Sequence, residues 1–116
     1  MAWKVQFHPD FADETRVLSE SVRIEILASV RLLEHFGPSL GRPHADTRGG
    51  SKHANMKELR FKADGGVWRI AFAFDPDRSA ILLVGGDKSG VSTGRFYKGL
   101  IKRADDRFDQ HLEALK

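Results

Sequence analysis

Residues 55–74, NMKELRFKADGGVWRIAFAF, decide the fold of this chain. On both sides of the central Asp64-Gly65-Gly66, residues of different polarity alternate, which is the two-residue period of a β-strand. Adjacent glycines adopt positive φ angles without steric cost and are typical of tight hairpin turns. The stretch therefore predicts a β-hairpin with strands over residues 55–63 and 67–74.

The turn type sets which side chains of this hairpin share a face. A two-residue turn at Asp64-Gly65, or a four-residue loop, places Arg60 opposite Arg69 with both side chains on one face. A turn shifted by one residue places Lys62 opposite Arg69, whereas a three-residue loop gives neither pair. Both the Arg60–Arg69 pairing and the Lys62–Arg69 pairing place two cations directly opposite one another. The prediction of a paired-cation face therefore holds unless the loop has three residues.

Like charges directly across a strand pair destabilise the pair by about a few tenths of a kcal/mol. Such a pair needs either a compensating acid in the protein or an anion from outside. Glu58 is the nearest acid in the sequence, and Asp87 is a second candidate further along the chain. The face is therefore either an anion-binding surface or the place of a structural ion pair.

The remaining elements follow from apolar spacing and from capping residues. Residues 4–7 alternate as a strand, and a helix from Pro9 to about residue 18 precedes a second helix that begins after Ser19 and ends at Gly37. Residues 39–54 indicate a loop, and residues 80–84, apolar on both faces, indicate a central strand. A last helix is capped by Ser92 or Thr93. Its apolar stripe consists of Phe96, Leu100, Ala104, Phe108, Leu112 and Leu115.

The order of elements is β-α-α-β-β-β-α, which predicts an α+β fold. We expect a small, mainly antiparallel twisted sheet with an N-terminal helical hairpin and a C-terminal helix. A chain of 116 residues fits one domain, here residues 1–116. The chain has no cysteine, which excludes disulfides and thiolate zinc sites and favours a cytoplasmic protein. Neither a signal peptide nor a membrane span is indicated.

Basic charge is concentrated in the middle of the chain, although the net charge is only +3. Residues 37–62 contain six Lys or Arg against two acids, a local +4, whereas residues 10–36 contain three Arg against six acids, a local −3. Local excess matters more than the total for a polyanionic partner. We therefore expect one surface to meet a polyanion.

Several side chains are candidates for chemistry on that surface. Lys88 adds a cation after Gly85-Gly86, where glycines allow a ligand to approach the backbone. Tyr97, the only tyrosine, lies off the apolar stripe of the last helix; it is either a ring that stacks on a base or moves a proton, or a plain surface ring. His53 precedes the Arg60 strand and is either an acid or base or a solvated loop histidine. The five histidines include no pair at metal-ligand spacing, so we expect no metal and no cofactor.

Four segments together resemble the RelE/ParE superfamily of type II toxins, most closely its phage-type HigB branch. They are MKELRF at residues 56–61, GVWRI at 66–70, ILLVGGDK at 81–88 and RFYK at 95–98. The resemblance implies a toxin held inactive by a cognate antitoxin. In RelE- and HigB-like members it also implies a metal-independent endoribonuclease that cuts mRNA on the ribosome.

The resemblance also assigns roles to residues of this chain. Arg60 matches a phosphate-contacting arginine, Arg69 matches the arginine of a strand motif, Lys88 falls near a catalytic basic position, and Tyr97 aligns with a catalytic tyrosine. Asp87 stands where RelE-like members have a basic residue. The expected catalytic set is Arg60, Arg69, Lys88, Tyr97 and His53, and the expected RNA-binding set is Arg48, Lys52, Lys57, Lys62 and Lys98.

Cleavage through the 2′-OH of RNA needs a base for that hydroxyl, cations for the phosphate and an acid for the leaving 5′ oxygen. If Tyr97 is the base, its pKa must lie well below about 10, which clustered cations favour. Two alternative functions stay open. One is a ParE-like inhibitor of DNA gyrase, and the other is a catalytically inactive module that only binds an antitoxin.

Overall fold

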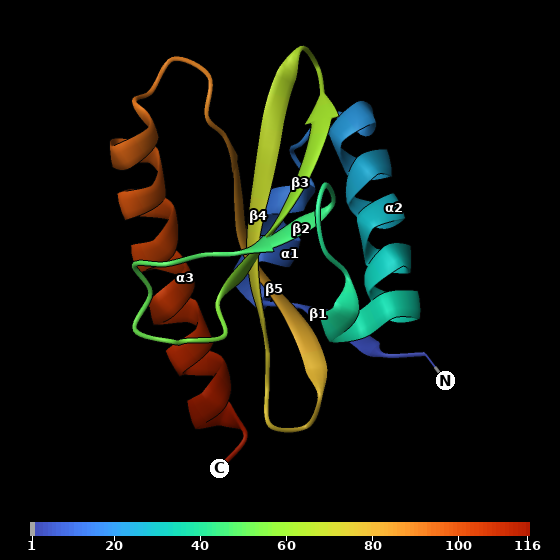
Figure 1. Cartoon of the computed structure of the whole chain (residues 1–116), viewed down its shortest axis with the longest axis vertical. Helices are drawn as coiled ribbons and strands as arrows, with labels where there is room; N and C mark the ends of the chain where they lie inside the picture. The colour runs from blue at the N-terminus through green and yellow to red at the C-terminus, as the bar shows by residue number, and fades with distance from the viewer. Residues whose placement is uncertain (1) are drawn as a thin grey trace.

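The computed structural model describes residues 2–116 and contains one five-stranded sheet with helices on both faces (Figure 1). The strands lie in the order β1-β5-β4-β3-β2. The elements in chain order are β1 (Lys4–Phe7), α1 (Pro9–Thr15), α2 (Glu20–Phe36), the 3-10 turn η1 (Gly37–Ser39), β2 (Ala45–Thr47), β3 (Lys57–Ala63), β4 (Gly66–Phe74), β5 (Ser79–Asp87) and α3 (Thr93–Ala114). The predicted α+β architecture is confirmed.

The hairpin of β3 and β4 closes through a two-residue turn. Asp64 and Gly65 have φ angles of 52° and 75°, and Ala63 pairs with Gly66 across the turn. Two successive positive φ angles are the geometry that matches the right-handed twist of a hairpin. Arg60 consequently pairs with Arg69, which confirms the first of the predicted registers.

β5 lies inside the sheet, between β1 and β4, and is nine residues long. Its pairing with β4 is antiparallel, whereas its pairing with β1 is parallel, so the sheet is mixed at one edge. The residues Ala80 to Val84 are all buried, as expected of a strand that is covered on both faces.

Two separate apolar cores lie on the two faces of the sheet. α1 and α2 pack on the face that carries Leu59, Ile70 and Leu82, and α3 packs on the face that carries Ala71 and Ile81. Figure 1 shows the sheet between α2 on one side and α3 on the other. Because side chains alternate along β3 and β4, the face of Arg60 and Arg69 is the α3 face.

Helix ends largely follow the predicted capping residues. The Ser19 hydroxyl accepts a hydrogen bond from the Val22 N–H, and the Ser92 hydroxyl, rather than that of Thr93, caps α3. Gly37 ends α2 with a φ angle of +56°, and a Cβ atom at this position would lie 2.4 Å from the Trp3 indole. Both conformation and space therefore require glycine at residue 37.

Three sequence predictions need correction. The loop predicted for residues 39–54 starts at the last residue of η1 and contains the short edge strand β2, whose three residues carry too little alternation to be recognised. α1 ends at Thr15, because the chain continues in turns whose N–H groups bond three residues back. Leu115 caps the C-terminus of α3 and is 43% exposed, so the apolar stripe stops at Leu112.

α3 is also fastened to the opposite side of the molecule by a buried cation. Both Nη atoms of Arg107 donate to the Glu14 carboxylate, at 2.8 and 2.5 Å, and Nη1 donates to the Leu83 carbonyl at 2.8 Å. Arg107 therefore ties α3 to β5 and to α1. Within residues 2–116, no helix has the length and apolar character that spanning a bilayer requires.

Candidate active site

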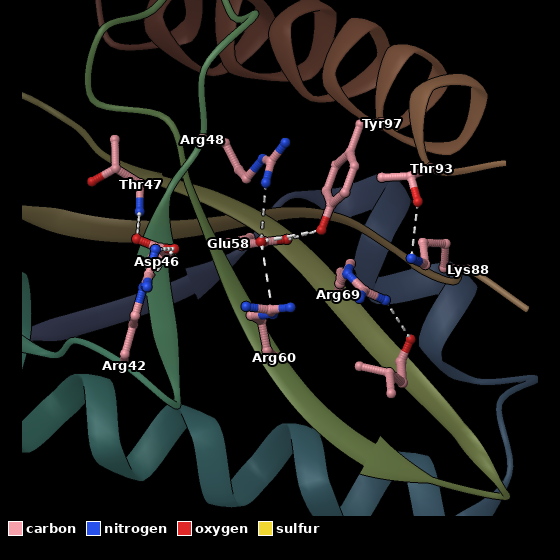
Figure 2. A network of polar contacts seen from close by, with 11 residues as sticks. Arg42, Asp46, Thr47, Arg48, Glu58, Arg60, Arg69, Lys88, Thr93 and Tyr97 are labelled. Carbon is pink, nitrogen blue, oxygen red and sulfur yellow. Dashed lines mark hydrogen bonds and ion pairs between the residues drawn. The ribbon is translucent and has the colours of Figure 1, made fainter.

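The α3 face of β3 and β4 carries a cluster of charged side chains beneath the first turns of α3 (Figure 2). We name it the arginine cluster and define it by Arg48, Glu58, Arg60, Arg69 and Tyr97. Strand alternation supplies Glu58, Arg60 and Arg69, while Arg48 follows β2 and Tyr97 descends from α3. Three cations and one acid give the cluster a net charge of two positive units.

Glu58 is the acid that partly balances these cations. Its side chain is 1% exposed, and the Tyr97 hydroxyl donates to it, with 2.8 Å to Oε2 and 3.1 Å to Oε1. Arg48 Nη1 lies 3.5 Å and Arg60 Nε 3.9 Å from Glu58 Oε1. The expected internal ion pair therefore exists, but one carboxylate leaves most of the positive charge uncompensated.

Arg69 lies at the bottom of the cluster and is only 6% exposed. Its Nη1 donates to the Val67 carbonyl at 3.0 Å, and its guanidinium lies 6.0 Å from the Phe96 ring centre and 5.8 Å from that of Tyr97. Gly86, its partner in β5, has no Cβ atom that would crowd Phe96, which an added Cβ would meet at 3.2 Å. The glycines at the end of β5 thus admit aromatic side chains close to the backbone.

Two guanidinium N–H groups in the cluster have no hydrogen-bond partner. Among the described residues, the Nε atoms of Arg48 and Arg69 are buried and unpaired. An unpaired buried donor costs about 1–3 kcal/mol, and more when the group is charged. Arg48 also lies over the Tyr97 ring, with its Cζ 3.7 Å from the ring centre. The two guanidinium groups with orphan donors both lie close to the ring of Tyr97, the only tyrosine of the chain.

The pKa of Tyr97 is raised above its ordinary value of 10.0, not lowered as expected from the clustered cations. Burial is the largest cause, and the hydrogen bond to Glu58 and its negative charge act in the same direction. Arg69 and Arg48 favour the phenolate but are outweighed. The expected lowering of the Tyr97 pKa by the clustered cations is therefore not found, and the Tyr97 hydroxyl donates a hydrogen bond to Glu58.

Asp87 is directed away from the arginine cluster. It pairs with Trp68 in the sheet, which places it on the α1 and α2 face, one residue after Gly86. Its carboxylate accepts hydrogen bonds from the backbone N–H and hydroxyl of Ser89, at 3.0 and 2.8 Å, and these bonds lower its pKa. The acid at this position therefore does not neutralise Arg60 or Arg69 through a direct contact.

Lys88 lies at the rim of the cluster, where its ammonium donates to the Thr93 hydroxyl at 3.0 Å (Figure 2). His53 is not brought to the cluster. Its Nε2 lies 2.8 Å from Asp109 Oδ1, twelve residues along α3 from Tyr97, which corresponds to about 18 Å of helix. The structure thus brings together four of the five expected catalytic residues and leaves His53 apart.

The expected RNA-binding residues do not lie on one surface. They are divided between the two faces of the sheet and between two grooves, one beside β3 and one beside α3. Lys57 lies on the opposite face of β3, where its ammonium donates to the Pro38 carbonyl at 3.0 Å. Arg60, Arg69 and exposed Lys62 line a groove of about 640 Å³ on the β3 side. Tyr97, Lys52 and Lys98 line a second groove, of about 540 Å³, on the α3 side.

Sequence reasoning placed Glu58 only as a charge-balancing residue and did not connect it to Tyr97. The available signal was its alternation with Arg60, which put both on one face of β3; the approach of Tyr97 depends on how α3 docks. Within residues 2–116, no three His, Asp or Glu side chains gather as ligands of a metal ion would.

Comparison with known proteins now places this geometry in a family. The family described as "Phage derived protein Gp49-like (DUF891)" matches residues 13–109. The chain belongs to this family. It is 49% identical over 88 residues to "Putative toxin HigB2" of Mycobacterium tuberculosis, covering 75% of this chain and 43% of that protein. It is 45% identical over 95 residues to "Putative toxin HigB3" of the same organism, covering 82% of this chain and 81% of that protein.

A solved structure with a similar fold is that of a double arginine-to-alanine mutant of the E. coli toxin RelE in its free state. The TM-score is 0.59 at 15% identity, with 89% of this chain and 98% of that chain covered. At that identity the likeness concerns the fold alone. Together these findings confirm the resemblance to the RelE superfamily of type II toxins and to its HigB-like branch.

Proposed function

We propose that this Gp49-like chain is the toxin of a type II toxin-antitoxin system, that it cleaves mRNA on the ribosome without a metal, and that a cognate antitoxin restrains it in the cytoplasm. Membership of the HigB-like branch supports the toxin assignment. The observation that carries the chemistry is the pair of buried, unpaired Nε donors of Arg48 and Arg69 beside the Tyr97–Glu58 hydrogen bond.

The arginine cluster binds the scissile phosphate in this proposal. Arg69 donates one hydrogen bond to the Val67 carbonyl and has an unpaired Nε–H, and the Arg60 side chain is 39% exposed. Guanidinium groups donate in a planar fork that matches phosphate oxygens. They also stabilise the additional negative charge of the pentacoordinate phosphate in the transition state.

Proton transfer is assigned to the Tyr97–Glu58 pair. The 2′-OH of the ribose gives its proton to the Tyr97 oxygen while the Tyr97 hydroxyl proton passes to Glu58 Oε2, 2.8 Å away. The 2′ oxygen forms a bond to phosphorus, the bond to the 5′ oxygen breaks, and that oxygen takes a proton from a solvent water as it leaves. Glu58 then gives the relayed proton to the resulting hydroxide, which restores the starting state. This relay avoids a free phenolate, in keeping with the raised pKa of Tyr97.

The proposal is tested with Arg60→Ala and with Lys57→Ala as the matched control on the opposite face of β3. Induced in cells, Arg60→Ala should lose growth inhibition and mRNA cuts within translated codons, as mapped by primer extension, while circular dichroism shows a folded protein. Lys57→Ala should retain both. A folded Arg60→Ala protein that still cuts would refute the proposal. Loss of gyrase supercoiling without cuts would instead support the ParE-like alternative.

A further inference from the structure

The segment between β2 and β3, residues 48–56, is fastened to α3 by two carboxylates. Asp105 accepts from the Ser51 hydroxyl and, at 3.2 Å, from the Lys52 backbone N–H. Asp109, one helical turn further along, pairs with the Lys52 ammonium and lies 2.8 Å from His53 Nε2. Figure 1 shows the green segment after β2 reaching across to α3. Lys52 and His53 lower the pKa of Asp109, so its carboxylate stays ionised at neutral pH.

The same segment begins with Arg48, which belongs to the arginine cluster. Its guanidinium lies over the Tyr97 ring and 3.5 Å from Glu58. The Arg48 N–H donates to the Met56 carbonyl at 2.9 Å, so the segment is closed into a loop. A movement of this loop away from α3 therefore moves the Arg48 guanidinium as well.

Gly49 and Gly50 lie between Arg48 and residues 51–53, which contact α3, and these glycines do little to fix the conformation of the loop. Gly50 has a φ angle of +85°, and a Cβ atom added to Gly49 or Gly50 would meet nothing within 4 Å. Glycine has the largest conformational freedom of any residue, and no neighbour restricts it here. Because these glycines do not themselves hold the loop against α3, the loop that starts at Arg48 is kept against the helix that carries Tyr97 by its contacts with Asp105 and Asp109.

We propose that Asp105 and Asp109 are positioning residues that hold Arg48 over Tyr97, where its guanidinium meets an RNA phosphate. The inference rests on the proposed function. It also assigns Lys52 and His53 to the fastening of the loop rather than to chemistry. Asp105 lines the groove on the α3 side together with lysines, and Asp109 pairs with one of these lysines, Lys52. Simple electrostatics predicts that removing an acid from a basic groove strengthens RNA binding. Positioning predicts the opposite sign.

Asp105→Ala, with Asp106→Ala as its control, tests whether the loss of an acid weakens or strengthens RNA binding. Asp106 is the next residue of α3 and lines the same groove. Among residues 2–116 its carboxylate bonds to Lys102 and to no residue of the loop, so its removal changes the charge equally without breaking a contact of the loop. The probe is a short fluorescein-labelled single-stranded RNA, 2′-O-methylated throughout and so not cleavable, followed by anisotropy over a salt series. Asp105→Ala should weaken binding about tenfold and lower the salt slope by about 0.7, the loss of one phosphate contact. Asp106→Ala should bind at least as tightly as the wild type.

Arg48→Ala completes the experiment. Alone it should reproduce the change seen with Asp105→Ala, and in the double variant Asp105→Ala should add nothing, because the two residues act through one contact. Ser51→Ala removes one of the two loop donors to Asp105 and should shift binding in the same direction by a smaller amount, which keeps the test possible should Asp105→Ala not fold. If Asp105→Ala and Ser51→Ala bind RNA as tightly as Asp106→Ala does, while Arg48→Ala weakens binding, the positioning role of Asp105 is refuted. The proposal that Arg48 binds phosphate would then still stand. If the wild type does not bind, or Arg48→Ala has no effect, the phosphate-binding proposal itself fails.

Discussion

Replacing Glu58 by glutamine separates binding from catalysis in the arginine cluster. The substitution keeps the shape of the side chain but removes the acid that, among residues 2–116, pairs with both Arg48 and Arg60, at 3.5 and 3.9 Å. At an effective dielectric constant near 20, each contact is worth about 4–5 kcal/mol before desolvation. Most of this is offset by desolvation, and Arg60 is 39% exposed and screened.

The net loss of stability from Glu58→Gln should be about 3 kcal/mol, the lower end for breaking a buried pair. For a chain of this length that corresponds to a fall in Tm of about 12 °C. Added non-cleavable RNA should raise the Tm of the variant by more than that of the wild type, because the cluster then carries three positive charges and no negative one. Differential scanning fluorimetry with and without RNA measures both effects.

Cleavage by Glu58→Gln should fall by about 10²–10⁴-fold, because the amide does not accept the proton from Tyr97. RNA binding should be unchanged or tighter. The assay is single-turnover cleavage of mRNA on programmed ribosomes, at a temperature below the Tm of the variant. Glu113→Gln, the same change at an exposed position of α3, is the control. A folded Glu58→Gln protein that cuts at the wild-type rate would refute the proton relay.

Three further predictions concern Tyr97, the α3 anchor and the α2 end. The phenol of Tyr97, the only tyrosine, should titrate at 295 nm above its ordinary pKa of 10.0, and its midpoint should fall in Glu58→Gln. The free energy of unfolding should therefore decrease as the pH rises above about 10, where the unfolded chain loses the phenol proton first; a stability that is flat there would contradict the raised pKa. Arg107→Ala should lower the free energy of unfolding, measured in urea, by about 2–3 kcal/mol, because Glu14 and the Leu83 carbonyl lose their donor. A change below about 0.5 kcal/mol would show that Arg107 does not stabilise the fold. Gly37→Ala should lower the free energy of unfolding by at least about 2 kcal/mol in the same measurement, since its Cβ would meet Trp3 and its φ angle is positive. A variant that unfolds at the same urea concentration as the wild type would refute the clash.

The fold was predictable where local chemistry determines it. The register of Arg60 against Arg69 follows from a two-residue turn, and the capping serines mark the starts of α2 and α3. The edge strand β2 was not predictable, because three residues carry no period of their own and pair only once β3 is in place. Its recognition needs the tertiary structure.

The site was only partly predictable because its chemistry depends on docking. Sequence alternation put Glu58 with Arg60, but the burial that raises the pKa of Tyr97 arises only when α3 covers the sheet. His53 stands among basic residues in the sequence, yet in the structure its partner is Asp109. The direction of Asp87 depends on its register with β4, which the sequence did not determine.

The position of Tyr97 near the start of α3 has a consequence for synthesis of the chain. The arginines of the cluster and Glu58 are synthesised before Tyr97. β1 pairs only with β5 in the sheet, so the sheet is complete only once β5 has been synthesised. Under the proposed mechanism a nascent chain without a docked α3 has cations but no proton relay. That mechanism would expose the ribosome that makes this chain to no cleavage until α3 has been translated and has closed the second core.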